Sequence, residues 1–412
     1  MSNTEETPWK VPGKWSLSPH SFEPEVRKDW KIPKKVTIHD VTLRDGEQTP
    51  GVVFRKEEKL KIAHALEDMG IQRIEGGMVA VSDEDFDALA TMAREMKKAE
   101  VCGFCRARRD DIERAIKAKL HWAIMEITAL DPIIKNIWGS REKAAEDIVG
   151  LTKYAKANGL KVCFFLMESA RAPLDLIREL IVPVVEEGGA DTVAIVDTRG
   201  SSYPQGFAWQ IAQVKKMVNV PIEVHCHNNW GLSTANTLAG ISAGAEIAHT
   251  CANGLGGNGP LDEIIMGIEA FLKAPTGVKT EGFRTFSAMV KEFAGPAGAE
   301  WYKPFSGSLT SQVEVGIATR QMWDRRTEHG YGRAELLNYE IVGGKAIDVV
   351  LGKKSGRYSI MLKSWELKLP QPSEEQAGEM LNQIKKISED NKRLVSEEEF
   401  RKIYGAVMGT GA

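Results

Sequence analysis

The chain has 412 residues, of which 42% are hydrophobic and 27% are charged, and its formal net charge is −3 at pH 7. This composition is typical of a globular protein with a sizeable core, and the near-neutral charge argues against nucleic acid or an anionic membrane as a partner. No apolar run approaches the roughly 20 residues that span a bilayer, and the odd number of five cysteines fits a reducing compartment, so we expect a cytoplasmic protein.

The first 35 residues show no period that predicts a helix or a strand. Trp9, Trp15 and Trp30 lie there among prolines and charged residues. Because amphipathic indoles favour contact surfaces, we expect residues 1–35 to form an arm that packs against the rest of the chain or against a second subunit.

From residue 36 onward, short β-rich runs alternate with helical patterns, several of which begin with Ser or Asp and end with Gly. The strand candidates are residues 36–42, 71–77, 100–106, 122–128, 160–167, 191–197, 221–227 and 246–251. Eight strand and helix repeats predict an α/β fold, a (β/α)8 TIM barrel over residues 36–275. A doubly wound open sheet is the alternative, which eight repeats of similar length make less favourable.

Cys102 and Cys105 form a C-x-x-C motif, which is the pattern of many redox sites. The motif lies inside a strand-like run, however, and not at the start of a helix, where the pKa of a thiol is lowered. We therefore expect two core cysteines and no redox centre.

Polar residues gather where three of the predicted strands end, and the active site of a TIM barrel lies at these C-terminal ends. His225 and His227 end the seventh strand, and strand alternation points both imidazoles to one side. Asp45 follows the first strand and Asn258 follows the eighth. One carboxylate, two imidazoles and an amide oxygen suit a divalent ion such as Mg, Mn or Zn, with positions left open for a chelating substrate.

Three motifs together resemble the DRE-TIM metallolyase superfamily: LRDGEQ at residues 43–48, HCHNN with a following AN at 225–236, and the glycine loop at 254–259. This family includes the isopropylmalate, homocitrate, citramalate and Re-type citrate synthases, the hydroxymethylglutaryl-CoA lyases and the 4-hydroxy-2-oxovalerate aldolases. The resemblance implies that the metal binds a 2-oxo acid through its ketone and carboxylate oxygens, and that Arg44 neutralises the oxyanion of the reaction. It also implies a homodimer.

The same resemblance implies roles for residues around the metal. Glu47 and Gln48 are expected to hold Arg44 and the substrate, and Glu75 ends the second strand at the same mouth; either carboxylate could instead be structural. Thr198 matches a threonine that contacts the substrate carboxylate, while Arg199 takes a place that is usually apolar. The expected substrate-binding residues are Arg44, Gln48, Glu75, Glu168, Arg171 and Thr198, of which Glu168 and Arg171 could alternatively be a surface ion pair.

The C-terminal third favours one branch of the family. LGKKSGR at residues 351–357 resembles a segment that the acyl-transferring synthases carry after the barrel and that the lyases and aldolases lack. Capping-box patterns that start at Ser373 and Ser396 predict two helices. We expect residues 276–412 to form a linker and a small, mainly helical subdomain.

Two features depart from the synthase pattern. The histidine of a Gly-Ile-His element, which helps to deprotonate acetyl-CoA in synthases, is replaced by Ala318. Tyr339 and His329 are the candidates for this proton transfer, and with Arg44 and Glu47 they make up the expected catalytic set. The loop at 254–259 lacks the usual Glu-Arg pair and looks more like that of the aldolases.

The sequence thus predicts an enzyme, an acyltransferase that condenses an acyl-CoA, expected to be acetyl-CoA, with a 2-oxo acid to give a 2-hydroxy di- or tricarboxylate and CoA. The alternative is a metal-dependent lyase or aldolase that runs the reverse chemistry. A second alternative, from a different class, is a barrel that binds metal without catalysis.

Overall fold

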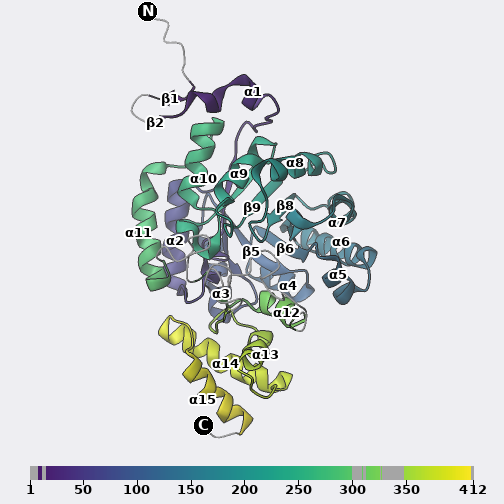
Figure 1. The fold of residues 1–412 in the computed structure, drawn as a ribbon, viewed down its shortest axis with the longest axis vertical. Helices are drawn as coiled ribbons and strands as arrows, with labels where there is room; N and C mark the ends of the chain where they lie inside the picture. The colour runs from purple at the N-terminus through teal and green to yellow at the C-terminus, as the bar shows by residue number, and fades with distance from the viewer. Residues whose placement is uncertain are drawn as a thin grey trace, which may run out of the picture.

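The computed structural model describes residues 8–11, 15–298, 309, 312–324, 326 and 348–409. Its centre is a closed barrel of parallel strands surrounded by helices (Figure 1). The barrel strands are β3 (Thr37–Asp40), β4 (Arg73–Met78), β5 (Glu100–Arg106), β6 (Trp122–Thr128), β7 (Lys161–Met167), β8 (Thr192–Asp197), β9 (Ile222–Cys226) and β10 (Ile247–Thr250). Because β10 pairs with β3 and closes the ring, the predicted TIM barrel is confirmed and the open sheet is excluded.

Helices connect the strands and cover the outside of the ring. They are α2 (Lys56–Met69), α3 (Asp83–Glu95), α4 (Arg109–Lys117), α5 (Asp131–Trp138), α6 (Arg141–Ala157), α7 (Leu174–Glu186), α8 (Pro204–Val214), α9 (Ser233–Ser242) and α10 (Leu261–Gly267). Helix α3 shows how the sequence specifies them. The Ser82 hydroxyl accepts a hydrogen bond from the backbone of Asp85, which caps the helix, and Leu89 and Met92 are buried on one face.

The N-terminal segment contains the short hairpin of β1 (Lys10–Val11) and β2 (Trp15–Ser16) and the single turn α1 (Pro24–Arg27). It lies at the end of the molecule opposite the C-terminal helices (Figure 1). The backbone amide of Lys31 donates to the carbonyl of Ser242, and Trp30 packs against the barrel core. The chain that leads into β3 therefore contacts the barrel, as expected for the arm.

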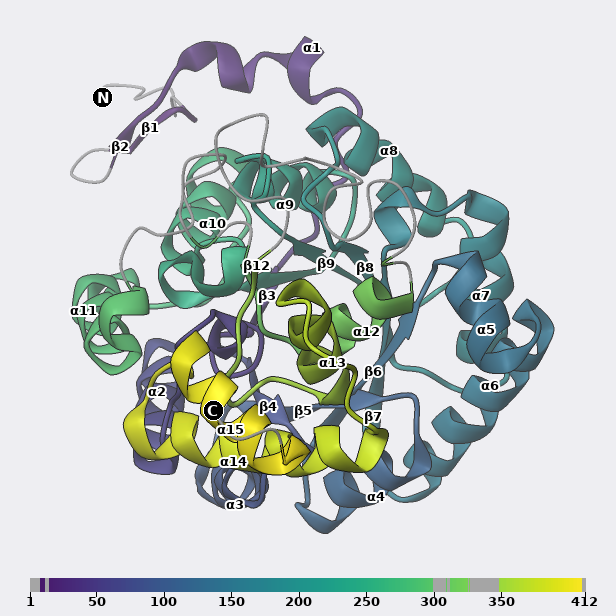
Figure 2. The same ribbon diagram turned by 60° about the horizontal axis from the view of Figure 1, so that its bottom comes forward.

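The C-terminal elements are α11 (Phe283–Ala294), β11 (Gln312–Val313), α12 (Gly316–Asp324), β12 (Asp348–Val349), α13 (Arg357–Glu366), α14 (Glu374–Asn391) and α15 (Glu397–Met408). Both predicted capping boxes are present, at Ser373 and Ser396. The last helices bury a core of their own, around Ile360, Met380 and Phe400. Figure 2 looks onto this end of the molecule, where α12 and α13 lie over the middle of the strand ring. The predicted helical C-terminal region is confirmed, while the domain boundaries stay a prediction.

The interior of the barrel has two unlike halves. Alternate residues of β5 to β8 form an apolar cluster: Cys102, Phe104, Trp122, Ile124, Cys163, Phe165, Ala194 and Val196. The strands of the other half contribute buried ionisable side chains: His39, Arg73, Glu75, Glu223, His225 and His249. Cys102 and Cys105 are buried and free, as predicted, and burial raises the pKa of Cys102 to about 12. Within the described residues, none of the helices is long and apolar enough to cross a membrane.

Candidate active site

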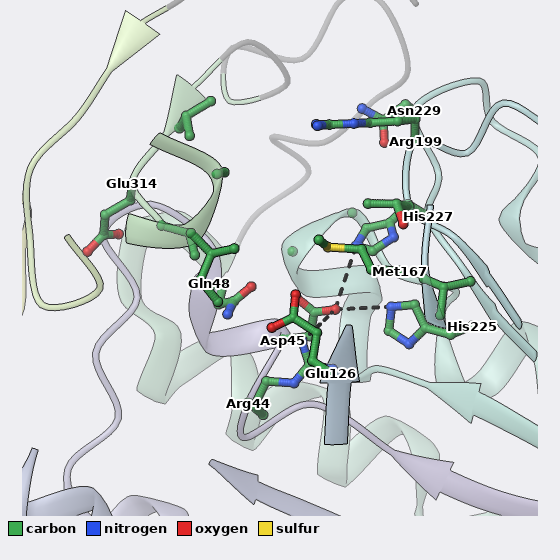
Figure 3. Close-up of a pocket in the computed structure, with 18 of the residues that line it drawn as sticks. Arg44, Asp45, Gln48, Glu126, Met167, Arg199, His225, His227, Asn229 and Glu314 are labelled. Atoms are coloured by element: carbon green, nitrogen blue, oxygen red, sulfur yellow. Dashed lines mark ion pairs between the residues drawn. The ribbon is translucent and has the colours of Figure 1, made fainter. Parts of the chain in front are cut away.

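Asp45, His225 and His227 meet at the C-terminal end of the barrel (Figure 3). An Asp45 carboxylate oxygen lies 3.1 Å from Nε2 of His225 and 3.6 Å from Nε2 of His227. The turn after β3 brings Asp45 there, because the amides of residues 44 to 46 all donate to the Val41 carbonyl. One carboxylate and two imidazoles whose ligand atoms lie within 4.8 Å of one another can hold a divalent ion. The structure therefore brings three of the four predicted ligands together.

The electrostatics of Asp45 suit a metal ligand. Burial alone would raise its pKa, but the Arg44 guanidinium and the two imidazoles outweigh this effect and hold the pKa well below its usual range. Asp45 is therefore an anion at every physiological pH, and a cation can bind it without displacing a proton.

Asn258, the fourth predicted ligand, lies beside the cluster. Its backbone forms an isolated bridge with His227, and its side-chain nitrogen donates to the Leu255 carbonyl over 3.0 Å. Gly256 in the same loop has a φ of 69°, and a Cβ there would lie 2.5 Å from the Asp45 carbonyl oxygen. The glycine thus lets the loop pack directly on the backbone of Asp45. The role of Asn258 as a ligand stays a prediction.

Arg44 is buried and held on several sides. Its Nε donates to Glu75, its Nη1 lies 3.2 Å from Asp45, and its guanidinium carbon lies 4.0 Å from the centre of the Phe104 ring. Among the described residues, Nη2 of Arg44 has no hydrogen-bond partner. The arginine is therefore fixed in place and retains a donor for an anion in the pocket.

Glu75 is not among the residues that line the pocket, and its expected role as a substrate ligand stays a prediction. Its side chain is fully buried, and its two oxygens bind Nε of Arg44 and Nε2 of His39, the latter at 3.0 Å. Burial would raise its pKa, but Arg44 and His39 lower it to about 2. Glu75 is thus a permanent anion that positions Arg44 from below.

A second histidine lies behind the His225 imidazole. Nδ1 of His225 is 3.0 Å from Nδ1 of His249, whose Nε2 is 2.6 Å from Glu223. Nε2 of His249 donates to the Glu223 carboxylate, and burial lowers the pKa of His249 to about 3, so its ring is neutral and accepts at Nδ1. Nδ1 of His225 therefore donates to His249, which leaves the lone pair of His225 Nε2 for a metal ion. The Arg73 guanidinium lies 2.6 Å from the other Glu223 oxygen and keeps this carboxylate ionised. The chain of contacts fixes both tautomers.

His39, Glu75 and His249 also lie close enough together to suggest a second metal site. Their ligand atoms already bind one another or Glu223, and the two imidazole rings stack with centroids 4.2 Å apart. This group is therefore a hydrogen-bonded support for His225 and Arg44.

We expect a His249→Phe variant to bind Mn²⁺ about 10- to 100-fold more weakly, because His225 loses the acceptor that orients its ring. Calorimetric titration of the metal-free protein measures this change, and circular dichroism checks the fold. The matched control is His64→Phe on α2, where the imidazole is exposed. A metal affinity equal to that of His64→Phe would contradict this role of His249.

The pocket above the cluster is bounded on one side by the barrel and on the other by the C-terminal segment. Gln48 and Thr198 line it, as predicted. From residues 312–321 come Gln312, Val313, Glu314, Val315, Ile317, Ala318 and Gln321. Ala318 thus lies at the site where the synthase pattern has a histidine, and it brings no base. Tyr339 and His329 lie outside the described residues.

Glu168 supports the pocket wall from behind. It is 1% exposed, and its carboxylate accepts hydrogen bonds from Arg171 at 2.9 Å and from Arg199 at 3.0 Å. Its backbone amide donates to the Thr198 hydroxyl over 2.7 Å. The predicted pair of Glu168 and Arg171 exists and is not a surface pair, but neither residue lines the pocket, whereas Arg199 does.

Glu47 has partners other than those expected. It binds Lys59 at 2.7 Å, Lys354 at 2.9 Å and Lys353 at 3.5 Å, while Lys59 and Lys353 also bind Asp85. We call these five residues the buried ion cluster. Although burial would raise the pKa of Glu47, the three ammonium groups lower it to about 2. Glu47 therefore joins the LGKKSGR segment to the turn that carries Asp45, and it does not hold Arg44 or line the pocket.

Glu126 is a pocket residue that the sequence reasoning missed. It follows Trp122 and Ile124 at alternate positions of β6, so that it faces the barrel interior, and it lines the pocket (Figure 3). Burial raises its pKa to about 7. The sequence signal that could have identified Glu126 is an acidic residue at an inward position of an apolar strand.

Comparisons with known proteins cover the barrel and most of the chain beyond it. A family model described as HMGL-like matches residues 35–290. The homocitrate synthase AksA of Methanopyrus kandleri is 33% identical over 90% of this chain and 92% of its own length. A probable 2-isopropylmalate synthase of Ignicoccus hospitalis is 35% identical over 92% and 93%, and a putative (R)-citramalate synthase CimA of Archaeoglobus fulgidus is 35% identical over 91% and 76%.

Among solved structures, hydroxymethylglutaryl-CoA lyase from Pseudomonas aeruginosa aligns with a TM-score of 0.56. The alignment covers 65% of this chain and 96% of the lyase, at 18% sequence identity. At that identity the likeness shows the fold alone. It leaves about a third of the chain without a counterpart in the lyase.

Proposed function

The chain belongs to the HMGL-like family, and from this membership we propose that it catalyses a metal-dependent Claisen-type condensation of an acyl-CoA, most simply acetyl-CoA, with a 2-oxo acid. The products are a 2-hydroxy di- or tricarboxylate and CoA, which makes the protein an acyltransferase that converts the acyl group into an alkyl group. The observation that carries this proposal is the share of the chain that the synthases match. The synthases match this chain along most of its length, including the C-terminal third, whereas the lyase matches little more than the barrel.

Asp45, His225 and His227 form the donor set for the divalent ion, with Asn258 as the proposed fourth ligand. A mixed set of oxygen and nitrogen donors suits Mg, Mn or Zn. Such an ion supplies Lewis-acid polarisation of the ketone when it is bound.

The side chains around the cluster provide the rest of the chemistry. As the new carbon–carbon bond forms, the ketone oxygen gains negative charge, which the unpartnered donor of Arg44 stabilises. Because the Thr198 hydroxyl accepts from the amide of Glu168, its own proton is available to the carboxylate of the 2-oxo acid. Tyr339 and His329 remain the proposed groups that remove a proton from the acyl carbon, and water then hydrolyses the thioester.

Two further parts of the proposal concern the setting of the enzyme. We propose a homodimer, as the family resemblance implies. We also propose a cytoplasmic location, which is supported by five buried cysteines that are all free.

Removal of divalent metal tests the proposed chemistry. We expect treatment with a chelator to abolish CoA release, measured with a thiol reagent, and re-addition of one of Mg²⁺, Mn²⁺ or Zn²⁺ to restore it. Circular dichroism should show an unchanged fold, because the barrel core does not depend on the cluster. Full CoA release from chelator-treated protein, verified to be metal-free by elemental analysis, would contradict the proposal.

A further inference from the structure

Glu126 comes from the side of the strand ring farthest from the predicted metal ligands. In the closed order, β6 is three strands from β3, which leads to Asp45, and three from β9, which carries His225. A 2-oxo acid whose carboxylate and ketone oxygens face the ligands extends its carbon chain away from them. That chain therefore points toward the wall to which β6 contributes.

This wall is apolar apart from Glu126, Thr198 and Arg199. The neighbouring pocket residues from β5, β7 and β8 are Phe104, Phe165, Met167 and Val196. Figure 3 shows Glu126 and Met167 in the pocket together with Asp45. A single partly buried carboxylate in a largely apolar wall is a specific environment, because it has lost part of its water and gains from a hydrogen-bond donor on a ligand.

The nearby cations have other partners. Arg44 binds Glu75 and Asp45 and keeps its Nη2 donor, while Arg199 binds Glu168; neither arginine donates to Glu126 among the described residues. Arg106, which pairs with Glu126 in the strand register, donates two hydrogen bonds to Asp111, at 2.8 and 2.9 Å.

Among the described residues, the Glu126 carboxylate has no hydrogen bond or ion pair. Burial raises its pKa to about 7, which reflects the same lack of solvation. A donor on the ligand would supply the missing partner.

We propose that Glu126 determines which 2-oxo acid the enzyme accepts: a monocarboxylic 2-oxo acid whose chain carries a hydroxyl or amino donor. A 2-oxo dicarboxylate would bring a second anion against Glu126, and a fully apolar chain would bury the carboxylate without a partner. This assignment rests on the proposed function, because that function supplies the 2-oxo acid.

The test is calorimetric binding to the Mn²⁺-loaded protein, which requires no turnover. The ligands are 4-hydroxy-2-oxobutanoate, 2-oxopentanoate and 2-oxoglutarate; the first two differ by a hydroxyl in place of a methyl group. We expect the wild type to bind the hydroxy acid at least about tenfold more tightly than either other ligand, since an unsatisfied buried acceptor is costly. Glu126→Leu should prefer 2-oxopentanoate. Glu126→Gln should keep the preference for the hydroxyl and gain affinity for 2-oxoglutarate.

Glu113→Gln, on the exposed surface of α4, is the matched control and should behave as the wild type. The proposal is overturned if the wild type binds 2-oxoglutarate as tightly as the hydroxy acid, if Glu126→Leu leaves the order of affinities unchanged, or if none of the three ligands binds. Absence of CoA release with every ligand, while the order of binding holds, would instead reject the condensation and retain Glu126 as the selective group.

Discussion

An Arg44→Lys variant should lose about 10²- to 10³-fold in kcat, because Arg44 is the proposed donor to the developing oxyanion. Lysine keeps the charge, but it cannot bind Glu75 and Asp45, stack on Phe104 and still present a donor to the pocket. Affinity for Mn²⁺ should stay within about threefold, since Arg44 is not in the donor set. The thiol assay gives kcat, and calorimetry gives the metal affinity.

Lysine preserves the charge, whereas removal of all charge at Arg44 would leave Glu75 buried without its cation, at a cost of about 3–5 kcal/mol in folding stability. The matched control is Arg401→Lys on the exposed face of α15. A kcat for Arg44→Lys within tenfold of the control would refute the proposed role. A loss of metal affinity as large as the loss in kcat would show that the variant disturbs the metal ligands instead.

The second large effect concerns the buried ion cluster. Glu47→Gln leaves Lys59 and Lys353 with Asp85 as their remaining partner in the cluster and removes the only cluster carboxylate that binds Lys354. Breaking buried pairs in this way costs about 3–5 kcal/mol. We expect the loss to appear first as faster hydrogen exchange in residues 351–357, because this segment is held against the barrel through its two lysines. Activity should fall as well, since residues 312–321 form part of the pocket wall.

The effect of Glu47 on stability should depend on pH. Its pKa is about 2 in the folded protein and about 4.3 in an unfolded chain, so the stabilisation is fully present above about pH 5 and is lost as the pH falls toward 2. Chemical denaturation at several pH values between 3 and 7 measures the free energy of unfolding. As the pH falls through this range, the free energy of unfolding should decrease less for Glu47→Gln than for the wild type. Glu398→Gln, in an exposed pair on α15, is the control and should follow the wild-type profile. Identical pH profiles for Glu47→Gln and this control would contradict the account.

The metal ligands could be predicted from sequence because their positions follow from local rules. Strand alternation places His225 and His227 on one side, and the closed parallel ring brings the ends of its first, seventh and eighth strands together. Asp45 therefore had to lie near them once the barrel was recognised. The core positions of Cys102 and Cys105 followed from their place inside a strand-like run and away from the start of a helix.

The partners of Glu47 and Glu75 could not be predicted in this way. Glu47 binds lysines that lie far along the chain, and no periodicity in the sequence relates the two segments. The partners of Glu75 could be predicted only from the pairing of strands in the closed barrel, in which His39 pairs directly with His249. Glu126 was predictable in principle from its inward position in an apolar strand, but it lies inside β6, away from the strand ends, and belongs to none of the family motifs.

The central claim is that the chain joins an acyl-CoA to a 2-oxo acid, and the most direct measurement is acetyl-CoA-dependent release of CoA with a panel of 2-oxo acids. The panel should include oxaloacetate, 2-oxoglutarate, pyruvate, 2-oxoisovalerate and 4-hydroxy-2-oxobutanoate, with mass-spectrometric detection of the product. The account predicts free thiol and an equal amount of a condensed 2-hydroxy acid with at least one of them, only when divalent metal is present. No release with any member of the panel, or cleavage of a hydroxy acid without added acyl-CoA, would contradict it.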